Sequence, residues 1–180
     1  MLRRKYSRDY KMRTMIGPDG RPRKVADYIG TEYRFCLSAD VRRPAARRLF
    51  GAGLLGCLAY LQPISTVNQL SSVTSSLVLH LCCAFPLGFL LWCLFQSAFA
   101  KEPLTRETAD KLTFRYLPSA CICALLAAAS FVSDVSWLCS PSGSAAQALD
   151  ITFAVCDACL CLLGCAAVFF RKYVRTEEMK

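Results

Sequence analysis

Charged side chains are missing from two long parts of this chain. Residues 49 to 100 contain no lysine, arginine, aspartate or glutamate, and residues 116 to 170 contain no cation and only three aspartates. The chain is 54% hydrophobic with a mean hydropathy of +0.34, above the roughly 45–50% of soluble proteins. These absences exclude an ordinary water-soluble domain and indicate a membrane protein.

Histidine is also scarce, with His80 alone in the chain. No serine therefore has a histidine base in a strand-and-turn setting, and no pair of zinc ligands combines a fixed spacing with access to water. The glycines of "GAGLLG" have the spacing of a dinucleotide fingerprint, but they open an apolar stretch instead of following a strand. We therefore expect no enzyme, no cofactor and no metal site.

Four apolar stretches are present, at about 49–66, 74–100, 116–138 and 148–170. Each is long enough to cross about 30 Å of hydrocarbon as a helix, the form in which backbone groups are paired within one segment. The sequence predicts an all-α membrane protein with four transmembrane helices in two hairpins. Its parts would be a cytoplasmic lead (1–45), a four-helix transmembrane bundle (46–175) and a tail (176–180).

The 22 cations fall only in the segments 1–48, 101–115 and 171–180, while the two remaining connections carry no charge. Short loops that hold lysine and arginine stay in the cytoplasm. The pattern predicts a multi-pass protein of the cell membrane with both termini in the cytoplasm.

Several cations directly flank the spans, where anionic lipid headgroups attract them by about 1 kcal/mol each. Nucleic acid is not expected as a partner, because no basic face is interleaved with aromatics and no recognition helix is present. The lipid bilayer and its anionic headgroups are the expected partners. The predicted headgroup contacts are Arg42, Arg43, Arg47, Arg48, Arg171 and Lys172.

The lead contains "YKMRTMI", then "GPDG", then "RPRKVADYIG". Two extended runs joined by a turn with Pro and Gly predict a β-hairpin over about 10–30. Because a lone hairpin is marginal in water, it needs support from the "TEYRF" segment, the inner loop, the membrane surface or a second chain. The alternative is a partly ordered basic arm.

Small and polar residues recur on one face of each predicted span. In lipid, helices associate through small residues that allow close approach and through polar side chains that pair across the contact. These faces are therefore predicted to lie against protein, within the chain or in a second copy or another membrane protein. Close helix packing is expected at Gly53, Gly56, Gly88 and Gly164.

His80, Asp134 and Asp157 form the sharpest polar cluster, since all three fall in the same half of the membrane. A carboxylate at this depth that faces lipid costs at least about 2.5 kcal/mol, so each should face the bundle and find a partner. One hypothesis is a proton relay, cation site or solute-binding cluster. The other is a structural set of hydrogen bonds between helices with one carboxyl protonated.

Of the twelve cysteines, ten lie within the predicted spans, where a thiol behaves as a small hydrophobic group. Four spans with the pair Cys156 and Cys159 look like quinone-linked thiol oxidases and vitamin K epoxide reductase-type proteins. Those proteins pass electrons through a second pair in an outer loop, and here the outer loops hold Cys139 alone. A membrane thiol oxidoreductase is therefore a remote alternative.

The layout of "GPDGRPRKVADYIGTEYRF", an arginine-rich approach and four spans with short loops resembles small four-span integral membrane proteins of Gram-positive anaerobic bacteria. That resemblance implies a bacterial cytoplasmic membrane and no catalysis. Two functions follow as hypotheses: a non-enzymatic interaction protein or accessory subunit that binds a membrane partner or anionic lipid, and a small-solute or ion transport component that uses the cluster of His80, Asp134 and Asp157.

Overall fold

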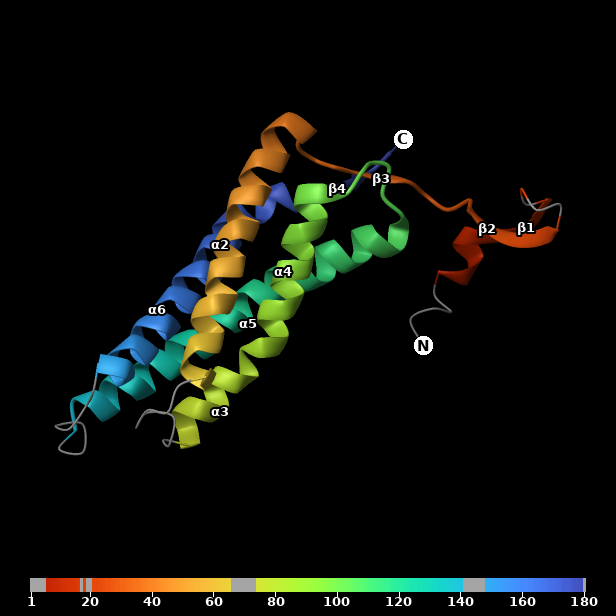
Figure 1. The fold of residues 1–180 in the computed structure, drawn as a ribbon. Helices are drawn as coiled ribbons and strands as arrows, with labels where there is room; N and C mark the ends of the chain where they lie inside the picture. The colour runs from red at the N-terminus through yellow and green to blue at the C-terminus, as the bar shows by residue number, and fades with distance from the viewer. Residues whose placement is uncertain (1–5, 17, 19–20, 66–73, 141–147, 180) are drawn as a thin grey trace.

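The computed structural model describes residues 6–16, 18, 21–65, 74–140 and 148–179. Long helices pack side by side as a shaft, and a β-hairpin projects from one end of it (Figure 1). The predicted all-α membrane class with an N-terminal hairpin is confirmed at this level, since three described helices are long and apolar enough to cross a membrane. They cover Leu77–Phe99, Arg106–Leu138 and Asp150–Tyr173.

The first long helix, α2 (Ala39–Ser65), begins ten residues before the predicted span and is not among those three. Its first ten residues carry four arginines. The apolar part that remains, 49–65, is shorter than the roughly 18–20 residues of a typical span. Four spans were predicted, and α2 differs from the other three because its apolar part is shorter than a typical span.

The predicted span 74–100 is divided into α3 (Thr74–Cys82) and α4 (Ala84–Phe99). The break falls at Cys83, three residues before Pro86. Proline has no N–H to donate, and its ring clashes with the carbonyl four residues earlier, here that of Cys82. The turn tightens accordingly, with the Cys83 N–H donating to the His80 carbonyl at 3.0 Å. This break lies three residues after His80.

Helix α5 (Arg106–Leu138) runs without a break through both the predicted inner connection and the predicted third span. Thr105 caps it by accepting a hydrogen bond from the Thr108 N–H. Its 33 residues extend about 50 Å, so its first turns continue beyond a hydrocarbon layer of about 30 Å. Helix α6 (Ala148–Phe169) follows and is continued by a short 3-10 helix, η4 (Phe170–Tyr173).

The predicted hairpin consists of β1 (Tyr10–Ile16) and β2 (Pro22–Tyr28), preceded by the 3-10 turn η1 (Ser7–Asp9). The strands are antiparallel, from the pair Tyr10 and Tyr28 to the pair Ile16 and Pro22. The Tyr28 hydroxyl donates to the Thr31 carbonyl and accepts from the N–H of Arg106 at the start of α5. The support that the hairpin needs therefore includes both the "TEYRF" segment and the inner loop region.

The predicted tail is not a free end. Residues Thr176–Glu178 form β4, which pairs antiparallel with β3 (Tyr33–Phe35) in the lead. Tyr33 also exchanges backbone hydrogen bonds with Leu104 in the α4–α5 connection. Three segments far apart in sequence thus meet at one end of the shaft.

Helix α2 packs along α4 and α6, and α5 packs along α3, α4 and α6. Three of the four predicted packing glycines lie in these contacts. A Cβ on Gly53 would meet the Leu91 side chain at 2.6 Å and one on Gly56 would meet Leu163 at 2.7 Å. At Gly164 the Cβ would lie 2.8 Å from the Ala124 backbone nitrogen, so the backbones of α5 and α6 lie close together there.

Gly88 does not have the predicted packing role within the chain: it is exposed, and nothing lies within 4 Å of an added Cβ. Ala84, one turn earlier on the same predicted face, is exposed as well. Because the helix is interrupted at Cys83, the face of α3 that carries His80 does not continue into α4. Helix α4 instead buries Leu87, Leu90, Cys93, Leu94, Ser97 and Ala98.

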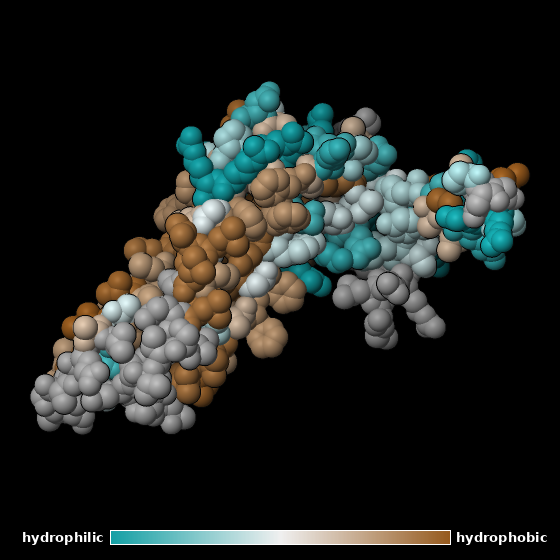
Figure 2. Space-filling model, in the orientation of Figure 1, coloured by the Kyte–Doolittle hydropathy of each residue, from teal (hydrophilic) through white to brown (hydrophobic). Residues whose placement is uncertain are grey.

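The surface is divided by polarity along the shaft. Figure 2 shows hydrophobic residues over most of the helical length and hydrophilic residues gathered at the end where α2 begins and on the hairpin. We call this hydrophilic part the basic end, formed by the start of α2, the start of α5, and η4. The exposed hydrophobic side chains of the shaft include Leu55, Phe85, Phe114, Leu125, Leu162 and Phe169.

Candidate functional site

The structure brings two members of the predicted polar cluster into direct contact. Nδ1 of His80, in the last turn of α3, lies 2.7 Å from Oδ1 of Asp157 on α6. Both side chains are completely inaccessible to solvent. The second carboxylate oxygen of Asp157, Oδ2, has no hydrogen-bond partner among the described residues. A buried polar pair therefore joins two helices that are distant in sequence.

Aromatic rings enclose the imidazole of His80. The Tyr60 ring of α2 stacks on it with a centroid distance of 4.6 Å and an interplanar angle of 4°, and Phe153 lies at 5.1 Å. Nε2 of His80 lies 2.9 Å from the Tyr60 carbonyl oxygen. Three helices thus hold the imidazole in a fixed orientation.

The hydrogen-bond partners restrict where the protons lie. A carbonyl oxygen only accepts, so Nε2 must carry a hydrogen. Nδ1 then either donates to an ionised Asp157, which makes an imidazolium–carboxylate pair, or accepts from a protonated Asp157, which makes a neutral pair. Moving one proton along a single hydrogen bond interconverts the two states without moving a heavy atom.

Asp134, the third predicted member, is completely buried on α5. Asp150 is also completely buried, in the first turn of α6 and two turns before Asp157. Asp150 falls on the same small and polar face of the predicted helix as Asp157, and this spacing in the sequence indicates that its side chain is buried too.

At the basic end, five of the six predicted headgroup contacts have side chains at the surface. Arg47, Arg48, Arg171 and Lys172 are exposed and Arg43 is partly exposed. Arg171 and Lys172, together with Arg175, border a groove of about 470 Å³ against α5. No carboxylate is among the described residues that line it, which are Leu112, Thr113, Tyr116, Leu117, Arg171, Lys172, Val174 and Arg175.

Arg42 corrects the sixth prediction, because its side chain is completely buried and points into the protein. Its guanidinium lies 3.6 Å from the centroid of the Phe35 ring and 3.3 Å from a Glu102 carboxylate oxygen, and it donates to the Ser97 carbonyl. Burial lowers the pKa of Arg42, and Glu102 opposes this effect. Periodicity alone does not separate Arg42 from its exposed neighbours, since its partners come from β3, α4 and the following connection.

The cysteines give no support to a redox pair. All twelve are free thiols, and Cys156 is buried while Cys159, one turn later, is exposed on the apolar shaft. The two side chains are one turn apart on α6, and the exposed thiol of Cys159 lies on the apolar surface of the shaft, not in a polar loop. Among the described residues, no group of three or more His, Cys, Asp or Glu side chains has the arrangement of a metal site.

No protein-family model, curated protein or solved structure matches this chain. Two features of the molecule bear on its function, the buried His80–Asp157 pair and the basic end.

Proposed function

We propose that this chain is a non-enzymatic, four-span interaction protein or accessory subunit of the bacterial cytoplasmic membrane, whose basic end binds anionic lipid headgroups. The observation that carries the proposal is the groove bordered by Arg171, Lys172 and Arg175. Three cations border it beside the exposed apolar Leu117, and no carboxylate is among its described lining residues. Cations beside apolar surface suit the boundary between headgroups and hydrocarbon.

Helix α2 acts as the fourth span in this proposal. It packs along α4 and α6 at Gly53 and Gly56, and its Tyr60 reaches His80 at the far end of the shaft. A helix that follows its neighbours over this length crosses the same layer. With the basic end on the cytoplasmic side, both termini are cytoplasmic, as the distribution of cations favours.

The hairpin supports an interaction role. Both faces of β1 are exposed, and apolar Met12 and Ile16 are 70% and 80% exposed on one of them. An exposed apolar face on a small projecting hairpin is suited to a protein partner. Co-purification from mild detergent of wild type and of a Met12→Glu, Ile16→Glu variant tests this role, since a partner held by the hairpin is lost from the variant.

The lipid role is tested by the lipids retained after purification from vesicles of equal phosphatidylglycerol and phosphatidylcholine. We expect wild-type protein to retain phosphatidylglycerol in excess and the variant Arg171→Gln, Lys172→Gln, Arg175→Gln to lose most of that excess. The matched control removes three exposed cations from the hairpin region, Lys11→Gln, Arg21→Gln and Lys24→Gln. Equal loss in both variants would show that only net charge matters and would refute the site.

A proton or cation transport component is the second candidate, favoured by the His80–Asp157 contact. The pair can exchange a proton along one hydrogen bond, but its complete burial means that a transport cycle must open the shaft to water. The test is proton flux into reconstituted vesicles, followed with an enclosed pH-sensitive dye. Flux that is abolished in Asp157→Asn supports transport, and equal flux in both proteins rejects this carboxyl as the coupling group.

A further inference from the structure

An open groove lies on the outside of the shaft, between α4 and α5. Its volume is about 480 Å³, and it is lined by Ala84, Phe85, Gly88, Phe89, Trp92, Lys111 and Arg115. None of these residues belongs to the predicted headgroup contacts or to the groove beside Arg171. The groove is therefore a second, separate feature of the surface that faces lipid.

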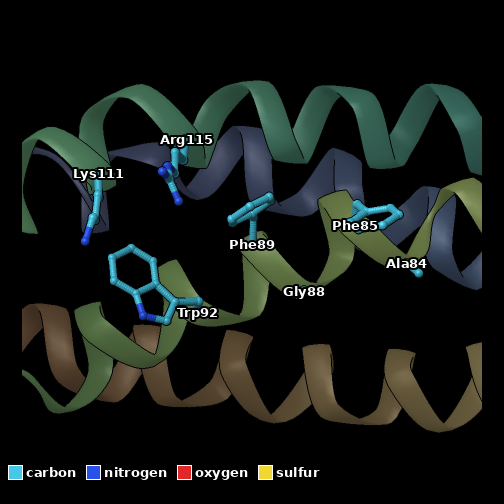
Figure 3. A pocket seen from close by; sticks show the side chains of 7 residues that line it. All are labelled: Ala84, Phe85, Gly88, Phe89, Trp92, Lys111 and Arg115. Atoms are coloured by element: carbon cyan, nitrogen blue, oxygen red, sulfur yellow. The ribbon is translucent and has the colours of Figure 1, made fainter. Parts of the chain in front are cut away.

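Polarity changes along the length of this groove. Figure 3 shows Lys111 and Arg115 of α5 near Trp92 at one end, Phe89 and Gly88 in the middle, and Phe85 and Ala84 at the other. The distance along α4 from Trp92 to Ala84 is about 12 Å at 1.5 Å per residue. Tryptophan is typical of the membrane–water interface, so the cationic end lies at headgroup level and the apolar end lies within the hydrocarbon.

We propose that this α4–α5 groove binds one anionic glycerophospholipid, with its phosphate between Lys111 and Arg115 and one acyl chain along Phe89 and Gly88 toward Ala84. This proposal rests on the proposed function, which places the basic end on the cytoplasmic side of the membrane. It adds a lipid site that is separate from the basic end. The absence of a side chain at Gly88, where nothing lies within 4 Å of an added Cβ, provides the space for the chain.

Charge complementarity favours an anionic lipid over an apolar helix as the occupant. The Arg115 guanidinium lies 5.0 Å from the Phe89 ring centroid and has no ion-pair partner among the described residues. Lys111 pairs with Glu107, one turn earlier on α5, so the Lys111 charge is partly neutralised. Arg115 is therefore the main cation for binding the lipid phosphate. An uncharged helix in the groove would leave the Arg115 charge without a counterion in a poorly solvated position.

Trp92 provides a local reporter of the groove. The chain has two tryptophans, so Trp137→Phe leaves Trp92 as the only one. In vesicles that mix unlabelled phosphatidylcholine with either brominated phosphatidylglycerol or brominated phosphatidylcholine, quenching of Trp92 measures the local preference for each lipid. We expect stronger quenching by the anionic lipid, and a preference about fivefold lower in Arg115→Gln, the effect of removing one cation near the headgroups.

Two further variants separate this site from its surroundings. Gly88→Leu fills the groove and is expected to remove the preference, whereas Gly51→Leu, at another glycine with open space around its Cβ, should retain it. Arg171→Gln with Lys172→Gln should leave quenching of Trp92 unchanged, which keeps this test independent of the basic-end groove. Equal quenching by both lipids in the wild type, or a preference that Arg115→Gln does not alter, would overturn the proposal. Absence of quenching by either lipid would show that protein covers the groove, and would overturn it as well.

Discussion

Nδ1 of His80 lies 2.7 Å from Oδ1 of Asp157, and 76 residues separate the two in sequence. This contact connects α3 to α6, and the Tyr60 carbonyl fixes the other side of the imidazole. Because both side chains are completely buried, the protonation state of the pair affects the free energy of unfolding of the protein. Replacing either residue therefore tests both the fold and the second proposed function.

Asp157→Asn should leave the protein folded. The amide N–H of asparagine can donate to Nδ1 of a neutral His80, so the contact is retained, and the free energy of unfolding should change by less than about 1.5 kcal/mol. His80→Ala leaves the Asp157 carboxyl buried without its partner and should cost about 3–5 kcal/mol. Unfolding in mixed micelles with increasing SDS measures both. Equal losses in the two variants would contradict the proposed hydrogen-bond geometry.

Gly164→Ala should destabilise the contact between α5 and α6. The added Cβ would lie 2.8 Å from the Ala124 backbone nitrogen, so one helix must move, at a cost of about 1–3 kcal/mol. Gly51→Ala is the matched control, because open space surrounds its Cβ and alanine is the better helix former. Thermal unfolding in mild detergent, followed by circular dichroism, should show a lower midpoint for Gly164→Ala only, and unchanged midpoints for both would argue against this close approach.

Arg42→Met should weaken the basic end. It removes charged hydrogen bonds to Ser97 and Glu102, each worth about 1.5–3 kcal/mol, while it retains an apolar stem beside Phe35. Arg48→Met removes the same charge from an exposed side chain and should change stability by less than about 0.5 kcal/mol. The same SDS titration compares them. A loss as large in Arg48→Met would show that charge, not the buried contacts, is responsible.

Two exposed cysteines at opposite ends of the shaft test the proposed topology. Cys36 follows β3 at the basic end, and Cys139 directly follows α5 at the other. A membrane-impermeant maleimide applied to intact cells should label wild-type protein and Cys36→Ser but not Cys139→Ser, because only Cys139 faces outward. After lysis, Cys139→Ser should become labelled at Cys36. Labelling of Cys139→Ser but not of Cys36→Ser in intact cells would show that the basic end faces outward, opposite to the proposed orientation.

The membrane class could be predicted from the sequence because it depends on composition over long windows. Helix α5 shows how well periodicity works where a helix is regular: its predicted small and polar face, from Tyr116 to Asp134, is buried. In α4 the predicted face does not lie in a contact within the chain: Gly88 is exposed, whereas His80 on α3 is buried. The helix is interrupted between the two, near Pro86, so one helical period does not describe both segments.

The basic end was predicted only in part for a different reason. Exposed and buried arginines look alike in sequence, so Arg42 could not be distinguished from Arg43 before its partners were known. The pairing of β3 with β4 was missed because each strand has three residues, too few for an alternating pattern to be recognised.

By itself the sequence determined that this is a helical membrane protein with cations confined to three segments, because hydropathy and charge are summed over neighbours along the chain. Only the tertiary structure decided that His80 contacts Asp157, that Arg42 is buried beside Phe35, and that Ala84 and Gly88 open onto an outer groove. Those relationships depend on which helices are adjacent and how each is rotated about its own axis. Rotation of a helix depends on side-chain packing between segments that are distant in sequence.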